Sequence, residues 1–212
     1  MKLLRPIQSR AFTLLELLVV IGIMVLVAGL IVGLSGVAGK RKRISVAQTE
    51  RDRLVMLIEA YRAKIGVYPP QNPNPNNLGK NTLFYELAGA LRTGPPENPV
   101  FVNNNGPVAF NIDSNTLYAE FGIPGIINSS DDPTEVKRLL KSVRPGQVAT
   151  LSANVYSLVV PIDGPNGQPN QWKYLVNTNA VGPNDFHNKE AFDLWVDIVS
   201  GDDTNRIGNW KD

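Results

Sequence analysis

The sequence predicts an α+β protein in which one long N-terminal helix, membrane-spanning in its first half and amphipathic in its second, packs on a small antiparallel β-sheet head domain. Three features of the 212-residue chain lead to this fold class. An apolar run extends to Val37, apolar residues then recur at helical spacing up to Ile65, and β-branched or aromatic runs gather towards the C-terminus. The length allows one such helix and one modest domain.

The first half of the expected helix is apolar on every side. Residues 12–37 contain a single charged side chain, Glu16, and about 20 apolar residues suffice to cross a bilayer. We therefore expect one membrane-spanning segment. A secretory signal peptide explains the run less well, because its apolar region is about 7–15 residues long and ends at a small-residue cleavage site. A plain membrane anchor stays open, although it gives no reason for a carboxylate, which is costly in lipid.

The second half of the expected helix, residues 38–65, is amphipathic. Gly66 and the pair Pro69 and Pro70 end the pattern. A helix from Thr13 to Ile65 would be about 80 Å long. Its apolar face, with members three and four residues apart, comprises Leu54, Leu57, Ile58, Tyr61 and Ile65.

Residues 66–212 are expected to form the globular head. Asn81 is the predicted N-cap of a helix ending at Leu91, and Asp132 is the predicted N-cap of a helix ending near Val143. The stretch from Gly94 to Asn128 is rich in Gly, Pro and Asn, which favours irregular loop. Strands are expected around 100–102 and 108–112 and, more strongly, at 156–162, 172–177 and 192–200. We expect the aromatic residues of the late strands to lie in the core or on a sheet face, namely Trp172, Tyr174 and Trp195.

The N-terminus carries a specific motif. Three basic residues with no acid among them, Lys2, Arg5 and Arg10, precede the sequence Phe-Thr-Leu-Leu-Glu-Leu-Leu-Val-Val at residues 12–20. This pattern resembles the N-terminus of the type IV pilin and type II secretion pseudopilin family. The resemblance implies that residues 1–11 are a leader peptide, which a prepilin peptidase removes between Ala11 and Phe12, and that the new amino group of Phe12 is methylated. The family's usual residue before the cut is Gly; Ala11 is the next smallest, so cleavage is still expected.

The resemblance also implies an assembly role for Glu16. Pilins use this carboxylate to neutralise the N-terminal amine of a neighbouring subunit as the filament grows. Opposite charges attract strongly in a low dielectric, while either charge alone is costly there. The implied partners are further copies of the chain, related minor pilins, an inner-membrane assembly platform and membrane lipid. The basic cluster at residues 40–43 suits either lipid head groups or acids on adjacent subunits.

The end of the chain, from Asp197 to Trp210, resembles that of major pseudopilins. In those proteins a loop that often holds calcium precedes an Asn-Trp ending. Asp202, Asp203 and Asn205 could supply part of the six to eight oxygens that calcium needs. A solvated turn explains the same residues, and no other cofactor is expected.

Composition argues against other classes of protein. The chain has no Cys and one His, His187, in a polar loop where we expect a surface residue. The sequence motifs of serine hydrolases, zinc proteases and phosphate-binding loops are absent from the chain, so no enzyme is expected. The formal net charge is +2, and loss of the leader would make it slightly negative. Nucleic acid is therefore not an expected partner.

The sequence thus predicts the structural subunit of a type II secretion pseudopilus. The subunit would pass once through the inner membrane, with its head in the periplasm or outside, and would enter a filament. A type IV pilus subunit for adhesion, motility or DNA uptake is the alternative within the same family. A membrane-tethered binding module that never polymerises is the alternative from a different class.

Overall fold

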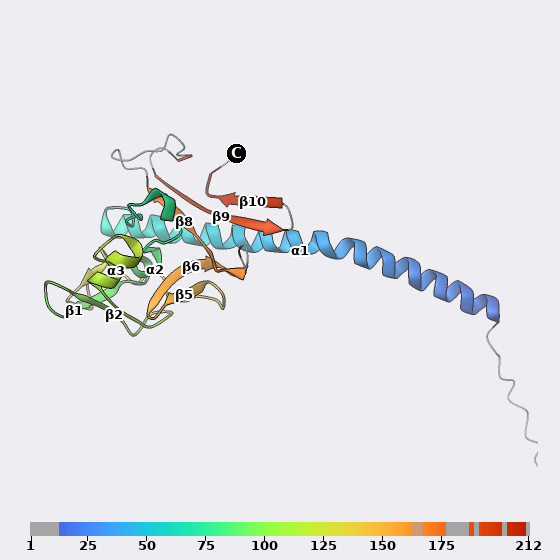
Figure 1. Ribbon diagram of the computed structural model, residues 1–212, viewed down its shortest axis with the longest axis horizontal. Helices are drawn as coiled ribbons and strands as arrows, with labels where there is room; N and C mark the ends of the chain where they lie inside the picture. Colours follow the sequence, from blue (N-terminus) through green and yellow to red (C-terminus); the bar gives the residue numbers. More distant parts are fainter. Residues whose placement is uncertain are drawn as a thin grey trace, which may run out of the picture. The chain divides into compact units, whose positions relative to one another are not determined.

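The computed structural model describes residues 13–162, 164, 167–176, 187–188, 191–200 and 203–210, without the side chains of 30–38 and 200. The chain divides into two compact units, Met1–Lys42 and Arg43–Asp212. One helix, α1, runs from Leu14 to Ile65 and contributes to both units (Figure 1). It starts one residue after the predicted start, Thr13, and it ends at the predicted residue.

In the first unit, α1 is exposed on all sides from Leu14 to Gly29. Each large apolar side chain from Leu14 to Val27 is 46% to 82% exposed. Nevertheless, no helix has, among the described residues, both the length and the apolar character needed to cross a membrane, for which about 20 apolar residues are required. The prediction of a membrane-spanning segment and of a single-pass location in the inner membrane is therefore wrong.

In the second unit, α1 contributes one buried stripe to the core. Ala47, Leu54, Ile58 and Tyr61 are fully buried there, and their spacing of seven, four and three keeps them on one side of the helix. The predicted face was slightly too wide, since Leu57 and Ile65 are only partly buried.

A short helix, α2 (Leu83–Ala88), lies in the centre of the second unit, and all six of its side chains are buried. It follows Thr82 and ends at Gly89, which has φ of 71° and ψ of 152°, a conformation essentially restricted to glycine. A Cβ atom at this glycine would lie 2.6 Å from Cγ1 of Val136. The predicted helix from Asn81 to Leu91 was therefore too long, because Gly89 ends it and the first strand, β1 (Ala90–Thr93), begins directly afterwards.

The first sheet has four short strands in the order β3-β2-β1-β4. Neighbouring strands in this sheet are antiparallel, except for β1 and β4, which run parallel. An unpredicted helix, α3 (Ser114–Phe121), follows β3 directly, because Asp113 accepts a hydrogen bond from Thr116 N at 3.0 Å and so caps it. The strands are β1 (Ala90–Thr93), β2 (Val100–Asn103), β3 (Phe110–Asp113) and β4 (Ser129–Ser130).

The other described strands form two further sheets, and each of these sheets has three antiparallel strands. The second sheet consists of β5 (Val148–Ser152), β6 (Val155–Val160) and β7 (Asn170–Gln171). The third consists of β8 (Lys173–Val176), β9 (Phe192–Ser200) and β10 (Asp203–Gly208), with β9 in the middle. The β9–β10 hairpin, drawn in red tones, is the longest of the strand pairs in Figure 1. A single 3-10 turn, η1, covers Pro75–Asn77.

The predicted fold class, a long helix packed on one small antiparallel sheet, is therefore wrong. The described strands form three small sheets, and one of these includes a parallel pair. The reason is that a second helix, α2, is wholly buried, so the strands are distributed around a mixed core. The expected core positions of Trp172 and Tyr174 are confirmed, while Trp195 is only partly buried.

The helix predicted from Asp132 to Val143 is also wrong. Asp132 does accept a hydrogen bond from Thr134 N at 2.8 Å, but it caps only a turn. The chain then continues in irregular form, because the amides of Leu139 and Leu140 both donate to the carbonyl oxygen of Leu87, at 3.0 and 2.8 Å. These bonds to α2 replace the ones that a local helix would have made.

Candidate functional site

The first candidate is the start of α1, where Thr13 and Glu16 bond to each other reciprocally. The amide and hydroxyl of Thr13 donate to Oε2 of Glu16 at 2.8 and 2.9 Å, and the amide of Glu16 donates to the Thr13 hydroxyl at 3.2 Å. This is a capping box, which satisfies amide groups that the first turn of a helix leaves without partners. The spacing Thr-x-x-Glu was present in the sequence and would have predicted it.

The capping box has an electrostatic consequence for Glu16. Its hydrogen bonds from Thr13, the backbone one first, lower the pKa of the Glu16 carboxyl. The group is therefore held in its ionised form at the exposed start of the helix. Of the other residues in the predicted processing and assembly site, Ala11 and Phe12 lie outside the described residues.

Behind Glu16, the exposed apolar side chains form a continuous sleeve around the helix, which we call the α1 sleeve (Leu14–Val27). Its members include Leu18 at 62%, Met24 at 66% and Leu26 at 65% exposure. A helix that is apolar on all sides is normally buried in a larger structure, and exposed apolar surface of this extent marks an interaction site. The arrangement is suited to association, not to chemistry.

The second candidate is the predicted calcium set near the C-terminus. Asp203 and Asn205 lie in β10, opposite Ser200 and Ile198 of β9, so they belong to a paired strand instead of a loop. Two positions apart, they point to the same face of the hairpin. Asp202 lies outside the described residues, and among those that are described no group of three His, Cys, Asp or Glu is placed to hold a metal. Calcium binding stays a prediction.

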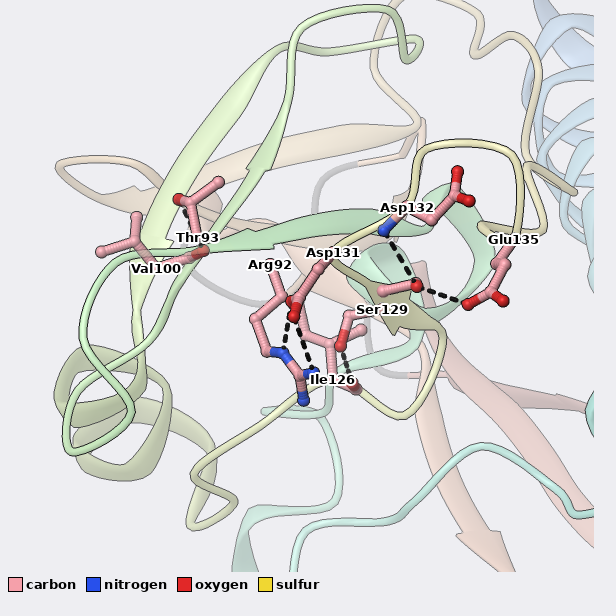
Figure 2. Close-up of polar contacts among 9 residues, drawn as sticks. Arg92, Thr93, Val100, Ile126, Ser129, Asp131, Asp132 and Glu135 are labelled. Atoms are coloured by element: carbon pink, nitrogen blue, oxygen red, sulfur yellow. Dashed lines mark hydrogen bonds and ion pairs between the residues drawn. The ribbon is translucent and has the colours of Figure 1, made fainter.

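The third candidate is a hollow beside the β1–β2 turn, about 380 Å³ in volume. It is lined by Arg92, Thr93, Gly94, Pro95, Pro96, Pro99 and Asp131. At its rim, Arg92 donates to both carboxylate oxygens of Asp131, at 2.9 and 3.4 Å (Figure 2). The hydrogen bond from Arg92 lowers the pKa of Asp131.

This hollow carries no evident chemistry. The Arg92 and Asp131 side chains are 50% and 73% exposed, and exposed ion pairs contribute little to stability. Next to them, Ser130 links the loop internally, since its hydroxyl donates to Glu135 at 2.6 Å and accepts from the amide of Asp132 at 3.1 Å. These contacts order the loop, and none of the residues that line the hollow, all of which the structure describes, has a buried side-chain polar atom without a partner.

The fourth candidate is a buried carboxylate that the sequence did not reveal, Glu86 of α2. One of its oxygens accepts from the Tyr61 hydroxyl at 2.7 Å and from the amide of Asn128 at 2.9 Å; the other accepts from the amide of Ile127 at 2.8 Å. Burial raises the pKa of Glu86, and these hydrogen bonds oppose the rise. Burial also raises the pKa of Tyr61. Because Glu86 is fully buried, it cannot reach a substrate, and its role is structural.

A last group of contacts fixes the final residues of the described chain. The ring of Trp210 stacks on His187 with centroids 3.9 Å apart, while the side chain of Asn209 accepts from the amide of Leu194 at 2.9 Å and donates to the carbonyl of Phe192 at 2.9 Å. His187 is exposed, as expected. Its backbone amide donates to Asp193 at 2.9 Å.

Comparisons of the chain with protein-family models, with curated proteins and with solved structures found no match.

Proposed function

We propose that this protein is the structural subunit of a filament, of the type II secretion pseudopilus kind, in which copies associate through the α1 sleeve. The observation that carries the proposal is the exposure of every large apolar side chain from Leu14 to Val27. Removing apolar surface from water contributes about 25 cal/mol per Å². Sleeves packed against one another would remove most of this surface from water, and this supplies the cohesion of the filament.

Glu16 gives this association its direction. It is the only charged side chain of the sleeve, and its carboxylate is held ionised by Thr13. Inside a bundle of apolar helices an isolated carboxylate is costly, so it needs a cation. The N-terminal motif resembles that of pilins, in which the amine of a neighbouring subunit is this cation, and we assign the same role to the amino group of processed Phe12.

The experiment compares two variants of the full chain. Glu16→Gln removes the charge and keeps the size of the side chain, whereas Thr13→Val removes the capping hydroxyl and keeps the carboxylate. If Glu16 neutralises a neighbour's amine, Glu16→Gln should enter filaments poorly while Thr13→Val keeps most of the incorporation. The readout is the fraction of the protein that sediments or cross-links as filament.

A capping role alone predicts a different pattern. If Glu16 only caps α1, Thr13→Val should lose more incorporation than Glu16→Gln, because Val removes both hydrogen bonds of the Thr13 hydroxyl while the amide oxygen of Gln still accepts from Thr13. A binding module that never polymerises predicts no filament fraction for the unmodified chain either. Normal incorporation of the Glu16→Gln variant into filaments would contradict the proposed assembly role of this carboxylate.

A further inference from the structure

Three consecutive asparagines, residues 103–105, precede Gly106 at the turn from β2 to β3. Asn103 is the last residue of β2, paired with Phe110 of β3. Asn104 and Asn105 are exposed. The three side chains share one chemistry but have different surroundings, and this difference decides which of them can react.

Asn103 is held rigidly in the core. Only 4% of it is exposed, and its Nδ2 donates to the carbonyl oxygens of Ala88 and Gly89, at 3.1 and 2.7 Å. Its Oδ1 accepts from the amide of Asn105 at 3.0 Å. The side chain is therefore fixed at both ends and unable to turn towards its own following amide.

Gly106 lies tightly against this fixed side chain. A Cβ atom at position 106 would lie 2.9 Å from Nδ2 of Asn103, a distance that real Cβ atoms essentially never show, and 3.0 Å from its Cγ. Since Asn103 cannot move away, the fold requires glycine at this position. Within the described part of the chain, moreover, the amide nitrogen of Gly106 donates no hydrogen bond.

We propose that Asn105 is a site of spontaneous deamidation. The amide nitrogen of Gly106, on losing its proton to solvent base, attacks Cγ of Asn105. A carbon–nitrogen bond forms, Nδ2 leaves as ammonia, and the product is a five-membered succinimide. Water then opens the ring at either carbonyl, giving aspartate or isoaspartate. The net change is the uptake of one water and the release of one ammonia.

The neighbouring asparagines are protected by the same geometry. The nucleophile for Asn104 would be the amide of Asn105, which is already bonded to Asn103. The electrophile for Asn103 is its own side chain, which is fixed in the core. Of the three described asparagines 103–105, only Asn105 combines an exposed carboxamide, an unbonded following amide and a following residue without a Cβ atom.

Conversion would change the β2–β3 turn in two ways. Either product places a negative charge next to the anchored Asn103, and isoaspartate also inserts one extra carbon into the main chain. Asparagine is among the residues that limit the lifetime of proteins at high temperature. The close approach that makes Gly106 necessary therefore also exposes Asn105 to ageing.

The test is peptide mapping of the full chain after prolonged incubation at mildly alkaline pH. Trypsin releases residues 93–137 as one peptide, and fragmentation locates the mass increase of an amide-to-acid conversion. We expect conversion at Asn105 in the wild-type chain. The conversion should disappear in the Asn105→Gln variant, and the Asn104→Gln variant should convert Asn105 as the wild type does. After the incubation, an isoaspartate-specific methyltransferase should label the wild-type chain, and it should label the Asn105→Gln variant less.

A sample incubated unfolded in urea serves as the reference for the chemistry. In that sample Asn104 should also convert, since the protecting hydrogen bonds are gone. The proposal is overturned if folded protein converts Asn104 as readily as Asn105. It is equally overturned if Asn105 stays intact in folded protein over a time in which the unfolded sample converts.

Discussion

At the scale of single residues, the most consequential group is Glu86, a fully buried carboxylate with three neutral hydrogen-bond donors. Burial favours its protonated form, while the three donors favour its ionised form. The pKa of Glu86 is raised in the folded protein, so the effect of burial is the larger one. Between the ordinary pKa of a glutamate and this raised value, the folded state binds more protons than the unfolded state.

This linkage predicts how Glu86 affects stability with pH. Its contribution to the free energy of unfolding is greatest at low pH and falls as pH rises through the raised pKa. Burial also raises the pKa of Glu50, so wild-type data alone do not isolate Glu86. Urea denaturation of wild type and Glu86→Gln at several pH values does isolate it.

We expect the stability difference, wild type minus Glu86→Gln, to grow as pH is lowered from neutrality. At neutral pH the variant has one acceptor oxygen fewer. The NH₂ group of the glutamine side chain must face either the amide of Ile127 or the donors Tyr61 and Asn128. Such a lost hydrogen bond costs about 1–3 kcal/mol, and removal of the buried charge offsets part of it. A difference that stays constant with pH would contradict the raised pKa.

At the scale of elements, Gly89 decides where α2 ends and β1 begins. Its φ of 71° and the 2.6 Å approach of Val136 to any Cβ atom both exclude a side chain. Gly89→Ala should therefore lower the free energy of unfolding by about 1–3 kcal/mol for the backbone conformation alone, with the steric clash in addition.

The matched control is the same substitution at Gly39, in the middle of α1. A Cβ atom there meets nothing within 4 Å, and alanine is the better helix former by about 0.5–1 kcal/mol. Thermal or urea unfolding, followed by circular dichroism, should show destabilisation at Gly89 and none at Gly39. Equal effects at the two positions would mean that Gly89 does not need its special conformation.

Elements with a strong local signal could be predicted from the sequence, and elements that depend on distant partners could not. The ends of α1 followed from hydrophobic spacing and from Gly66, and β9 lies at the predicted residues 192–200. The helix predicted at Asp132 is absent because its backbone bonds to Leu87, a partner that no local pattern reveals. The parallel pairing of β1 with the two-residue β4 is equally non-local.

The candidate sites divide in the same way. Glu16 could be selected from the sequence because it stands alone in an apolar run, and its partner Thr13 could have been selected from the capping-box spacing. Glu86 could not, since Leu-Phe-Tyr-Glu-Leu-Ala reads as an ordinary half-exposed helix until its burial is known. The three donors of Glu86 come from positions 61, 127 and 128, and only the folded chain brings them together.

At the scale of the whole molecule, the division into two units predicts different behaviour for each. The unit Arg43–Asp212 contains the described core, so residues 43–212 produced alone should fold cooperatively and remain monomeric. The full chain should associate, because it carries the α1 sleeve. Analytical ultracentrifugation of the two proteins at matched concentrations measures this difference.

The control is a full chain in which Leu18 and Leu26 of the sleeve are changed to Ser. It keeps the length of α1 and should associate less than the unmodified chain. Association of the residue 43–212 fragment to the same extent as the full chain would place the contact surface outside the sleeve. This result would also remove the main support for the proposed filament.

The contacts of Glu86 have one more consequence, for the way in which the second unit loses its structure. Its carboxylate joins α1 through Tyr61, its own helix α2, and the irregular segment at 127–128. None of the three segments can detach alone without leaving buried polar groups unpaired, at a cost comparable to a large fraction of the stability of a typical domain. Partial opening by fraying of one element is therefore suppressed, and the irregular loop shares the cooperativity of the helices that it joins.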